Sequence, residues 1–172
     1  ISATHFMYGF LPAEDISAPI RARHISAAFL FTIGQWVNDV PYDPELYFAG
    51  EEASLTLRTY TNGYDIFNPN QMVIWHLKYH FSQRNRHWNT FDETIQKLAN
   101  ISDAKFYKIV NGENLGIYGI GTLRSIEEWE IYSGVSFKDQ VAYPDVYAGK
   151  VPNPVTITDL DEWQRLKETG NV

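Results

Sequence analysis

Gly50-Glu-Glu-Ala-Ser-Leu-Thr-Leu-Arg-Thr-Tyr-Thr61 is the stretch of this sequence that predicts local structure most clearly. Its apolar side chains recur at the spacing of one helical face, formed by Ala53, Leu57 and Tyr60. Glu51 and Glu52 lie in the first turn, where negative charge suits the positive end of the helix dipole. Gly63 follows the last turn and favours a helix end. We therefore expect an amphipathic helix over residues 50–61.

Strand and helix patterns alternate on both sides of this segment. Apolar or β-branched runs predict strands at residues 25–33 and 72–79. Helical patterns with capping residues cover residues 91–101, 105–110, 125–133 and 159–168. The third of these begins with Ser125 and Glu128 at the spacing of a capping box. The sequence therefore predicts a mixed α/β fold.

Composition excludes several classes of protein. The chain has 172 residues, which suits a single domain or part of a larger one. Its 14 Lys and Arg against 21 Asp and Glu give a net charge of −7, which does not favour nucleic acid or an anionic membrane as partner. No apolar run is long enough to predict a membrane span. The absence of cysteine excludes disulfides and thiol catalysis, and suits a cytoplasmic location.

A few polar residues are candidates for chemistry, and each has a plainer interpretation. His76 is either a core histidine or a metal ligand. Glu51 and Glu52 either compensate the helix dipole or line a site. Arg84 and Arg86 either belong to a solvated loop or meet an anionic ligand.

Several short motifs occur in one order along the chain. They are Val40-Pro-Tyr-Asp-Pro44, Phe48-Ala-Gly-Glu-Glu52, Leu57-Arg58, Thr61-Asn-Gly-Tyr-Asp65, Pro69, His76, Tyr118-Gly-Ile-Gly-Thr-Leu-Arg124 and Tyr132-Ser-Gly-Val135. Together this pattern, over residues 27–137, resembles the GlcNAc-type glycosyltransferases, the relatives of cytoplasmic hydroxyproline α-N-acetylglucosaminyltransferases. It is also similar to the catalytic region of polypeptide N-acetylgalactosaminyltransferases.

The resemblance implies a GT-A fold, with a mixed sheet and flanking helices, and a retaining transfer reaction. A sugar, N-acetylglucosamine by this resemblance, would pass from a UDP-sugar to a hydroxyl acceptor on a protein or glycan. A divalent metal ion, Mn²⁺ in this family, would support the reaction. Developing charge on a diphosphate leaving group is stabilised effectively by such an ion.

The same resemblance assigns roles to individual positions. Glu51 would face the donor sugar as a catalytic carboxylate, with Glu52 beside it, and His76 would be a metal ligand. Arg58 would give structural support within its helix. The positions implied to bind substrate are Asp65, Trp75, Tyr79, Arg84 and Arg86.

One expected motif has no match in the first part of the sequence. The family carries an early Asp-x-His or Asp-x-Asp metal motif, and nothing upstream of Ile25 supplies it. We therefore expect residues 1–172 to be a single domain or the C-terminal half of a catalytic domain. Its partner would be the N-terminal half, and the chain alone would be weakly active or inactive.

Two other classes of function compete with a transferase. A non-catalytic carbohydrate-binding or interaction module would need aromatic platforms and no metal. A glycoside hydrolase would need two carboxylates facing each other across a bond, and adjacent Glu51 and Glu52 on a helix are a poor pair for that task.

Overall fold

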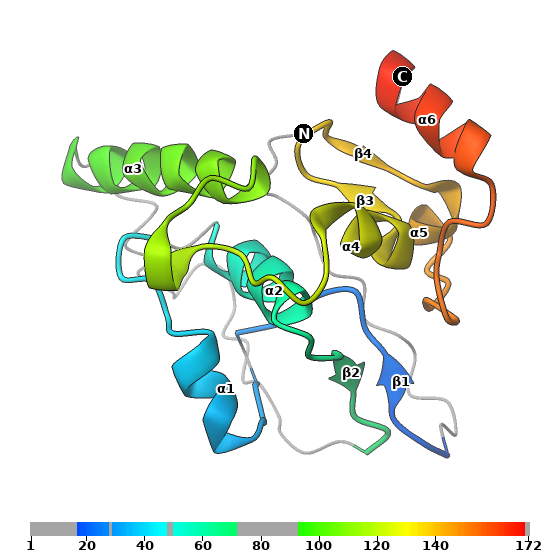
Figure 1. Ribbon diagram of the computed structural model, residues 1–172, viewed down its shortest axis with the longest axis horizontal. Helices are drawn as coiled ribbons and strands as arrows, with labels where there is room; N and C mark the ends of the chain where they lie inside the picture. Colours follow the sequence, from blue (N-terminus) through cyan, green and yellow to red (C-terminus); the bar gives the residue numbers. More distant parts are fainter. Residues whose placement is uncertain (1–16, 28, 48–49, 72–92, 171–172) are drawn as a thin grey trace, which may run out of the picture.

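The computed structural model describes residues 17–27, 29–47, 50–71 and 93–170 (Figure 1). Its α-helices are α1 (Gly34–Asp39), α2 (Glu51–Thr61), α3 (Glu93–Val110), α4 (Ile126–Ser133), α5 (Pro144–Tyr147) and α6 (Leu160–Thr169), and a short 3-10 helix, η3, covers Gly116–Tyr118. Its strands are β1 (Ile20–Arg21), β2 (Phe67–Asn68), β3 (Val135–Ser136) and β4 (Val141–Ala142). Within these ranges the strands form two antiparallel pairs, β1 with β2 and β3 with β4. The predicted mixture of helix and strand is confirmed, and a larger mixed sheet stays a prediction.

Helix α2 lies at the centre of the largest apolar core. Its residues 53–59 are all buried, and it packs against α4. The core also takes residues from α3 and the β3–β4 pair, and its buried members are Leu46, Ala53, Leu57, Phe106, Ile109, Val110, Trp129, Tyr132, Val135, Phe137 and Ala142. Burial on several sides explains why a helix with so many small polar residues is stable here.

The helix ends follow the local signals in the sequence. α2 covers Glu51–Thr61, and Gly63 beyond it has a φ of +87°. Ser125 and Glu128 form the predicted capping box of α4, which ends at the left-handed Gly134. The Asp159 side chain accepts a hydrogen bond from the Glu162 backbone N–H at 3.0 Å and caps α6. These three predictions are confirmed, because caps depend on residues only a few positions apart.

Two predictions of secondary structure are wrong. Residues 25–27 and 29–33 form no strand, because the Ile25 backbone N–H donates to Thr56 Oγ1 at 2.9 Å rather than to a neighbouring strand. The apolar side chains that follow are largely exposed, Phe31 by 88%. The two separate helices expected at 91–101 and 105–110 are, over the described residues 93–110, one continuous helix, α3.

The segment 119–124 lies directly against the C-terminal end of α2. A Cβ at Gly121 would approach the Thr61 carbonyl group and the Asn62 nitrogen to 2.5 Å. The Gly121 N–H donates to Thr61 Oγ1 at 2.8 Å, and the Leu123 and Arg124 N–H groups donate to the Thr61 carbonyl. Gly121 of the Gly119-Ile-Gly121 motif therefore serves close packing on the end of α2 and not a phosphate cradle.

Candidate functional site

The acidic pair Glu51 and Glu52 opens α2 where this helix meets α3. Gly50 precedes the pair and is buried. A Cβ at Gly50 would lie 3.4 Å from both the Ser102 Oγ and the Phe106 Cβ of α3. Glycine therefore allows the start of α2 to approach α3 closely, and this contact fixes the position of both carboxylates.

Glu52 has a partner within the chain. Its Oε1 accepts a hydrogen bond from the Ala27 backbone N–H at 2.7 Å. One turn later, Thr56 Oγ1 donates to the Glu52 carbonyl at 2.7 Å while it accepts from the Ile25 N–H. Glu52 and Thr56 together hold residues 25–27 along α2, so the Glu52 carboxylate is already engaged in structure.

Glu51 has a different environment. Its Oε2 is buried and has no hydrogen-bond partner among the described residues. Burial raises the pKa of the Glu51 carboxyl to about 7, opposed by a hydrogen bond from its own backbone and reinforced by the charge of Glu52. Glu51 is therefore protonated in a large fraction of molecules at neutral pH and can either donate or accept a hydrogen bond.

The loop between α1 and α2 brings an aromatic ring near the acidic pair. Tyr42 is 57% exposed, although Val40 and Asp43 on either side are each 1% exposed. Burial raises the pKa of the Tyr42 phenol above its ordinary value, and the charges of Glu51 and Glu52 raise it further. The protonation of the Tyr42 phenol is therefore coupled to the charge of the acidic pair.

Asp43 anchors this loop to α3. Its carboxylate forms an ion pair with the Lys105 ammonium, with N–O distances of 2.8 and 2.9 Å. It also accepts a hydrogen bond from the Glu45 N–H at 3.1 Å. The side chain of Asp43 is fully buried and that of Lys105 is 13% exposed, so water screens this pair only weakly.

Arg58 supports the interior of the fold, as the sequence predicts. It is fully buried, and it donates to the Ile117 carbonyl at 2.9 Å and the Gly119 carbonyl at 3.3 Å. Its guanidinium lies 5.9 Å from the centre of the Tyr118 ring, and the Lys105 ammonium lies 4.9 Å from the same ring. Arg58 therefore connects α2 to the segment before α4, while its buried Nη1 has no hydrogen-bond partner among the described residues.

Asp65 lies beyond the other end of α2 from the acidic pair. The 11 residues of this helix separate the two positions by roughly 16 Å. The Asp65 carboxylate pairs with Arg124 at 2.9 Å and Arg21 at 3.4 Å. The structure therefore does not bring Asp65 together with Glu51 and Glu52, and its predicted contact with substrate stays a prediction.

The remaining predicted site residues lie outside the described part of the chain. They are Trp75, His76, Tyr79, Arg84 and Arg86. Within the described ranges, no group of three or more His, Asp or Glu side chains is placed to hold a metal ion. The described residues alone therefore do not make a metal site.

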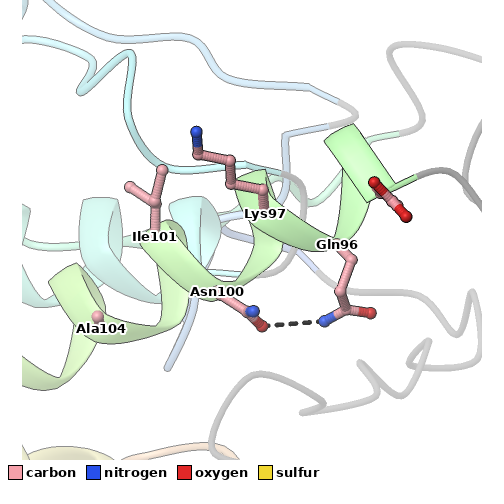
Figure 2. A pocket seen from close by; sticks show the side chains of 6 residues that line it. Gln96, Lys97, Asn100, Ile101 and Ala104 are labelled. Atoms are coloured by element: carbon pink, nitrogen blue, oxygen red, sulfur yellow. Dashed lines mark hydrogen bonds between the residues drawn. The ribbon is translucent and has the colours of Figure 1, made fainter.

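A cavity of about 550 Å³ runs along the first half of α3 (Figure 2). Its described lining comes from Glu93, Gln96, Lys97, Asn100, Ile101 and Ala104. Ser102, Phe106 and Ile109 mark the buried side of the same helix, and the lining residues project away from that side. This cavity is therefore separate from the acidic pair, which meets α3 on its buried side.

Two contributors to the site escaped the sequence reasoning. Asp43 and Tyr42 belong to the motif Val40-Pro-Tyr-Asp-Pro44, which pointed to a family but to no role. The signal that could have found them is an acidic residue in a turn with a proline on each side, Pro41 and Pro44, upstream of the glycine that precedes a helix. Their roles depend on Lys105, which lies 62 residues away from Asp43.

A model of the glycosyltransferase (GlcNAc) family matches residues 8–117. The chain belongs to this family. The match covers nearly two thirds of the chain and includes the Tyr42, Asp43, Glu51 and Glu52 positions. It begins earlier than the resemblance seen in the sequence and ends before the segment Tyr118–Arg124.

No curated protein and no solved structure matches the chain. The GT-A fold expected from the resemblance therefore stays a prediction. Among the described residues, no helix is both long enough and apolar enough to cross a membrane.

Proposed function

We propose that this GlcNAc glycosyltransferase family member transfers N-acetylglucosamine from UDP-N-acetylglucosamine to a hydroxyl acceptor on a protein or glycan, with retention of configuration. The observation that carries the proposal is the acidic pair at the start of α2, which lies inside the family match. Two adjacent carboxyl groups there have unequal surroundings: Glu52 accepts a hydrogen bond from the Ala27 backbone, while Glu51 has one buried oxygen, Oε2, without a partner among the described residues. Unequal carboxyl groups can take different roles at a reacting sugar.

Glu51 is the residue that we assign to the donor sugar. A carboxyl group with an oxygen left unpaired by the protein can bind sugar hydroxyls and stabilise positive charge that develops at the anomeric carbon. Its raised pKa of about 7 lets it respond to the charge of a bound diphosphate. Glu52 is the positioning residue, because its hydrogen bond to Ala27 keeps the adjacent chain along α2.

A divalent metal ion, Mn²⁺, belongs to this proposal with His76 as one ligand. When bound, such an ion neutralises charge on the leaving diphosphate. The described residues do not complete its ligand set. We therefore assign the remaining ligands to an early Asp-x-His or Asp-x-Asp motif in the N-terminal half of a GT-A catalytic domain. The cysteine-free composition supports a cytoplasmic location for the enzyme.

Isosteric variants test the two glutamate roles. Transfer of labelled N-acetylglucosamine is measured with the chain alone and with the complete catalytic domain. Glu51→Gln should lower the rate by about 100-fold, because an amide can neither ionise nor take up a proton in this range. Glu52→Gln should change it only a few-fold, since an amide oxygen can still accept the Ala27 hydrogen bond.

The controls separate catalysis from folding and from simple binding. Glu93→Gln, an exposed position on α3, should leave transfer unchanged. Equal losses in Glu51→Gln and Glu52→Gln would contradict the division of roles. UDP-sugar binding that needs no Mn²⁺ and survives His76→Ala would exclude the metal role. Sugar binding without turnover in the complete domain would instead favour a non-catalytic carbohydrate-binding module.

A further inference from the structure

Residues 29–33 carry large apolar side chains that the structure leaves in solvent. Every residue from Phe29 to Gln35 is exposed, and the Phe31 side chain is the most exposed of the large apolar ones, by 88%. The exposed large apolar side chains of this stretch and of the following helix α1 are Phe29, Leu30, Phe31, Ile33 and Val37. Soluble proteins rarely expose so many such side chains close together, and a surface of this kind usually marks a contact with other protein.

The backbone of this stretch is open as well. No backbone hydrogen bond joins Leu30, Phe31 or Thr32 to another described residue. Ile33 is extended, with φ −75° and ψ 149°. Free N–H and C=O groups on an extended chain form an edge on which another strand can pair. Charged residues and prolines commonly protect such an edge, and residues 25–38 contain neither.

The order of the side chains indicates that both faces of this stretch need cover. In an extended chain, Phe29, Phe31 and Ile33 lie on one face and Leu30 lies on the other. Large apolar residues on both faces are typical of a strand inside a sheet that is covered on both sides. Edge-to-edge pairing with a second copy of the chain would satisfy the backbone but would leave both faces in water. The occupant that fits is a folded unit that supplies both a neighbouring strand and a covering layer.

This stretch leads directly to the acidic pair at the start of α2. The Ala27 N–H, two residues before Phe29, donates to Glu52 Oε1 at 2.7 Å. Two residues of chain span at most about 7 Å, so a strand paired with residues 29–33 passes close to Glu52. In the proposed function, this site needs metal ligands that the described residues do not complete. The folded unit to which we assign those ligands is the N-terminal half of the catalytic domain.

We propose that residues 29–33 form an inner β-strand of the complete catalytic domain, paired with and covered by its N-terminal half. This inference rests on the proposed function, because that function requires the N-terminal half, and it locates the surface on which that half docks. Pairing satisfies the open backbone groups of Leu30, Phe31 and Thr32. The covering layer removes the exposed apolar side chains from water.

Hydrogen exchange tests the pairing of the backbone. The 172-residue chain is compared with the complete catalytic domain. The amides of Leu30, Phe31 and Thr32 should exchange at nearly the rate of an unfolded peptide in the chain alone, and at least about 100-fold more slowly in the complete domain. The Leu123 amide, which already donates to the Thr61 carbonyl, is the internal control and should be protected in both proteins.

The variant Phe31→Asp tests the cover over the side chains. It should leave the urea midpoint of the chain alone unchanged, because Phe31 is exposed there, and lower that of the complete domain by about 1 M. Ile117→Asp is the matched control at another exposed apolar residue, and it should shift neither midpoint by more than about 0.2 M. Equal shifts for the two variants in the complete domain would overturn the cover over Phe31.

The outcomes of the exchange experiment separate this inference from the proposed function. Fast exchange in both proteins would overturn the inference, and continued transfer of N-acetylglucosamine would leave the proposed function standing. Protection already present in the chain alone would also overturn it, in favour of a second copy if the protection rises with concentration and of another segment of this chain if it does not. Protection in a complete domain that transfers no sugar would support the docking surface and contradict the proposed function.

Discussion

Glu51 and Glu52 are neighbours of the same residue type, yet the fold separates their chemistry. Burial gives Glu51 a pKa of about 7, while an unfolded chain would release this proton near pH 4.5. Between these values the folded state holds the extra proton, so a rise in pH through this window favours unfolding. We expect Glu51→Gln to remove this loss of stability. Urea unfolding at pH 5, 6 and 7 measures it, with Glu93→Gln as control. Identical pH slopes in Glu51→Gln and the wild type would contradict the assignment.

His24 should change the stability with pH in the opposite direction to Glu51. Burial lowers the pKa of its imidazole to about 4, and the charge of Arg23 lowers it further. The ring centre lies 6.1 Å from that of Trp129 and 5.9 Å from that of Phe137. Between pH 6.5 and 4 the unfolded chain takes up a proton that the folded chain does not, so stability falls as the pH falls.

Replacement of His24 by Gln should flatten this acid-side slope. The same urea series, extended from pH 6.5 to pH 4, measures the difference between the variant and the wild type. The pH windows of His24 and Glu51 overlap, and the two groups change the stability in opposite directions. The stability of the wild type should therefore vary little with pH near pH 5.5, and that of each single variant should vary more. An acid-side slope unaffected by His24→Gln would show that other groups control it.

Single residues could be predicted from the sequence where the signal is local or belongs to a motif. Glu51 was found through its position after a glycine at a helix start. The burial of Asp43 could not be foreseen, because it depends on a lysine from a distant helix.

At the scale of elements, the contact between α2 and the segment 119–124 requires a glycine. A Cβ at Gly121 would lie 2.5 Å from backbone atoms of Thr61 and Asn62, which cannot move without distortion of the helix end. We expect Gly121→Ala to lower the free energy of unfolding by about 3 kcal/mol. Gly34→Ala is the matched control, since a Cβ there meets nothing within 4 Å and lies in α1. Similar unfolding midpoints for the two variants would contradict this close approach.

The elements themselves were predictable to different degrees. The ends of α2, α4 and α6 followed from capping residues and glycines close in sequence. The apolar run at residues 25–33 has the composition of a strand, but its backbone is recruited by Thr56 and Glu52 of α2. Tertiary hydrogen bonds of this kind override local propensity, which is the reason why the strand prediction failed.

At the scale of the whole molecule, one ionic cluster joins segments that lie far apart in the sequence. Asp43 before α2 pairs with Lys105 of α3, and the Lys105 ammonium lies over the ring of Tyr118. Arg58 of α2 reaches the carbonyl groups on both sides of that tyrosine. The family resemblance named most of these positions, but only the folded structure shows that they meet.

Loss of one partner of the Asp43–Lys105 pair should be costly, because it leaves the other charge buried. We expect Lys105→Met to lower the free energy of unfolding by about 3 kcal/mol. Lys150→Met breaks the Lys150–Asp145 pair, which has the same 2.8 Å distance but is largely exposed, and should cost less than about 0.5 kcal/mol.

The double variant Asp43→Asn/Lys105→Met distinguishes the contribution of the buried ion pair to stability from that of the packing of the lysine stem. Removal of both charges eliminates the unpaired carboxylate, so the double variant should be more stable than Lys105→Met alone. Urea unfolding of the three proteins at pH 7 measures these differences. A double variant less stable than Lys105→Met would mean that Asp43 stabilises the loop through its hydrogen bond to Glu45 rather than through Lys105.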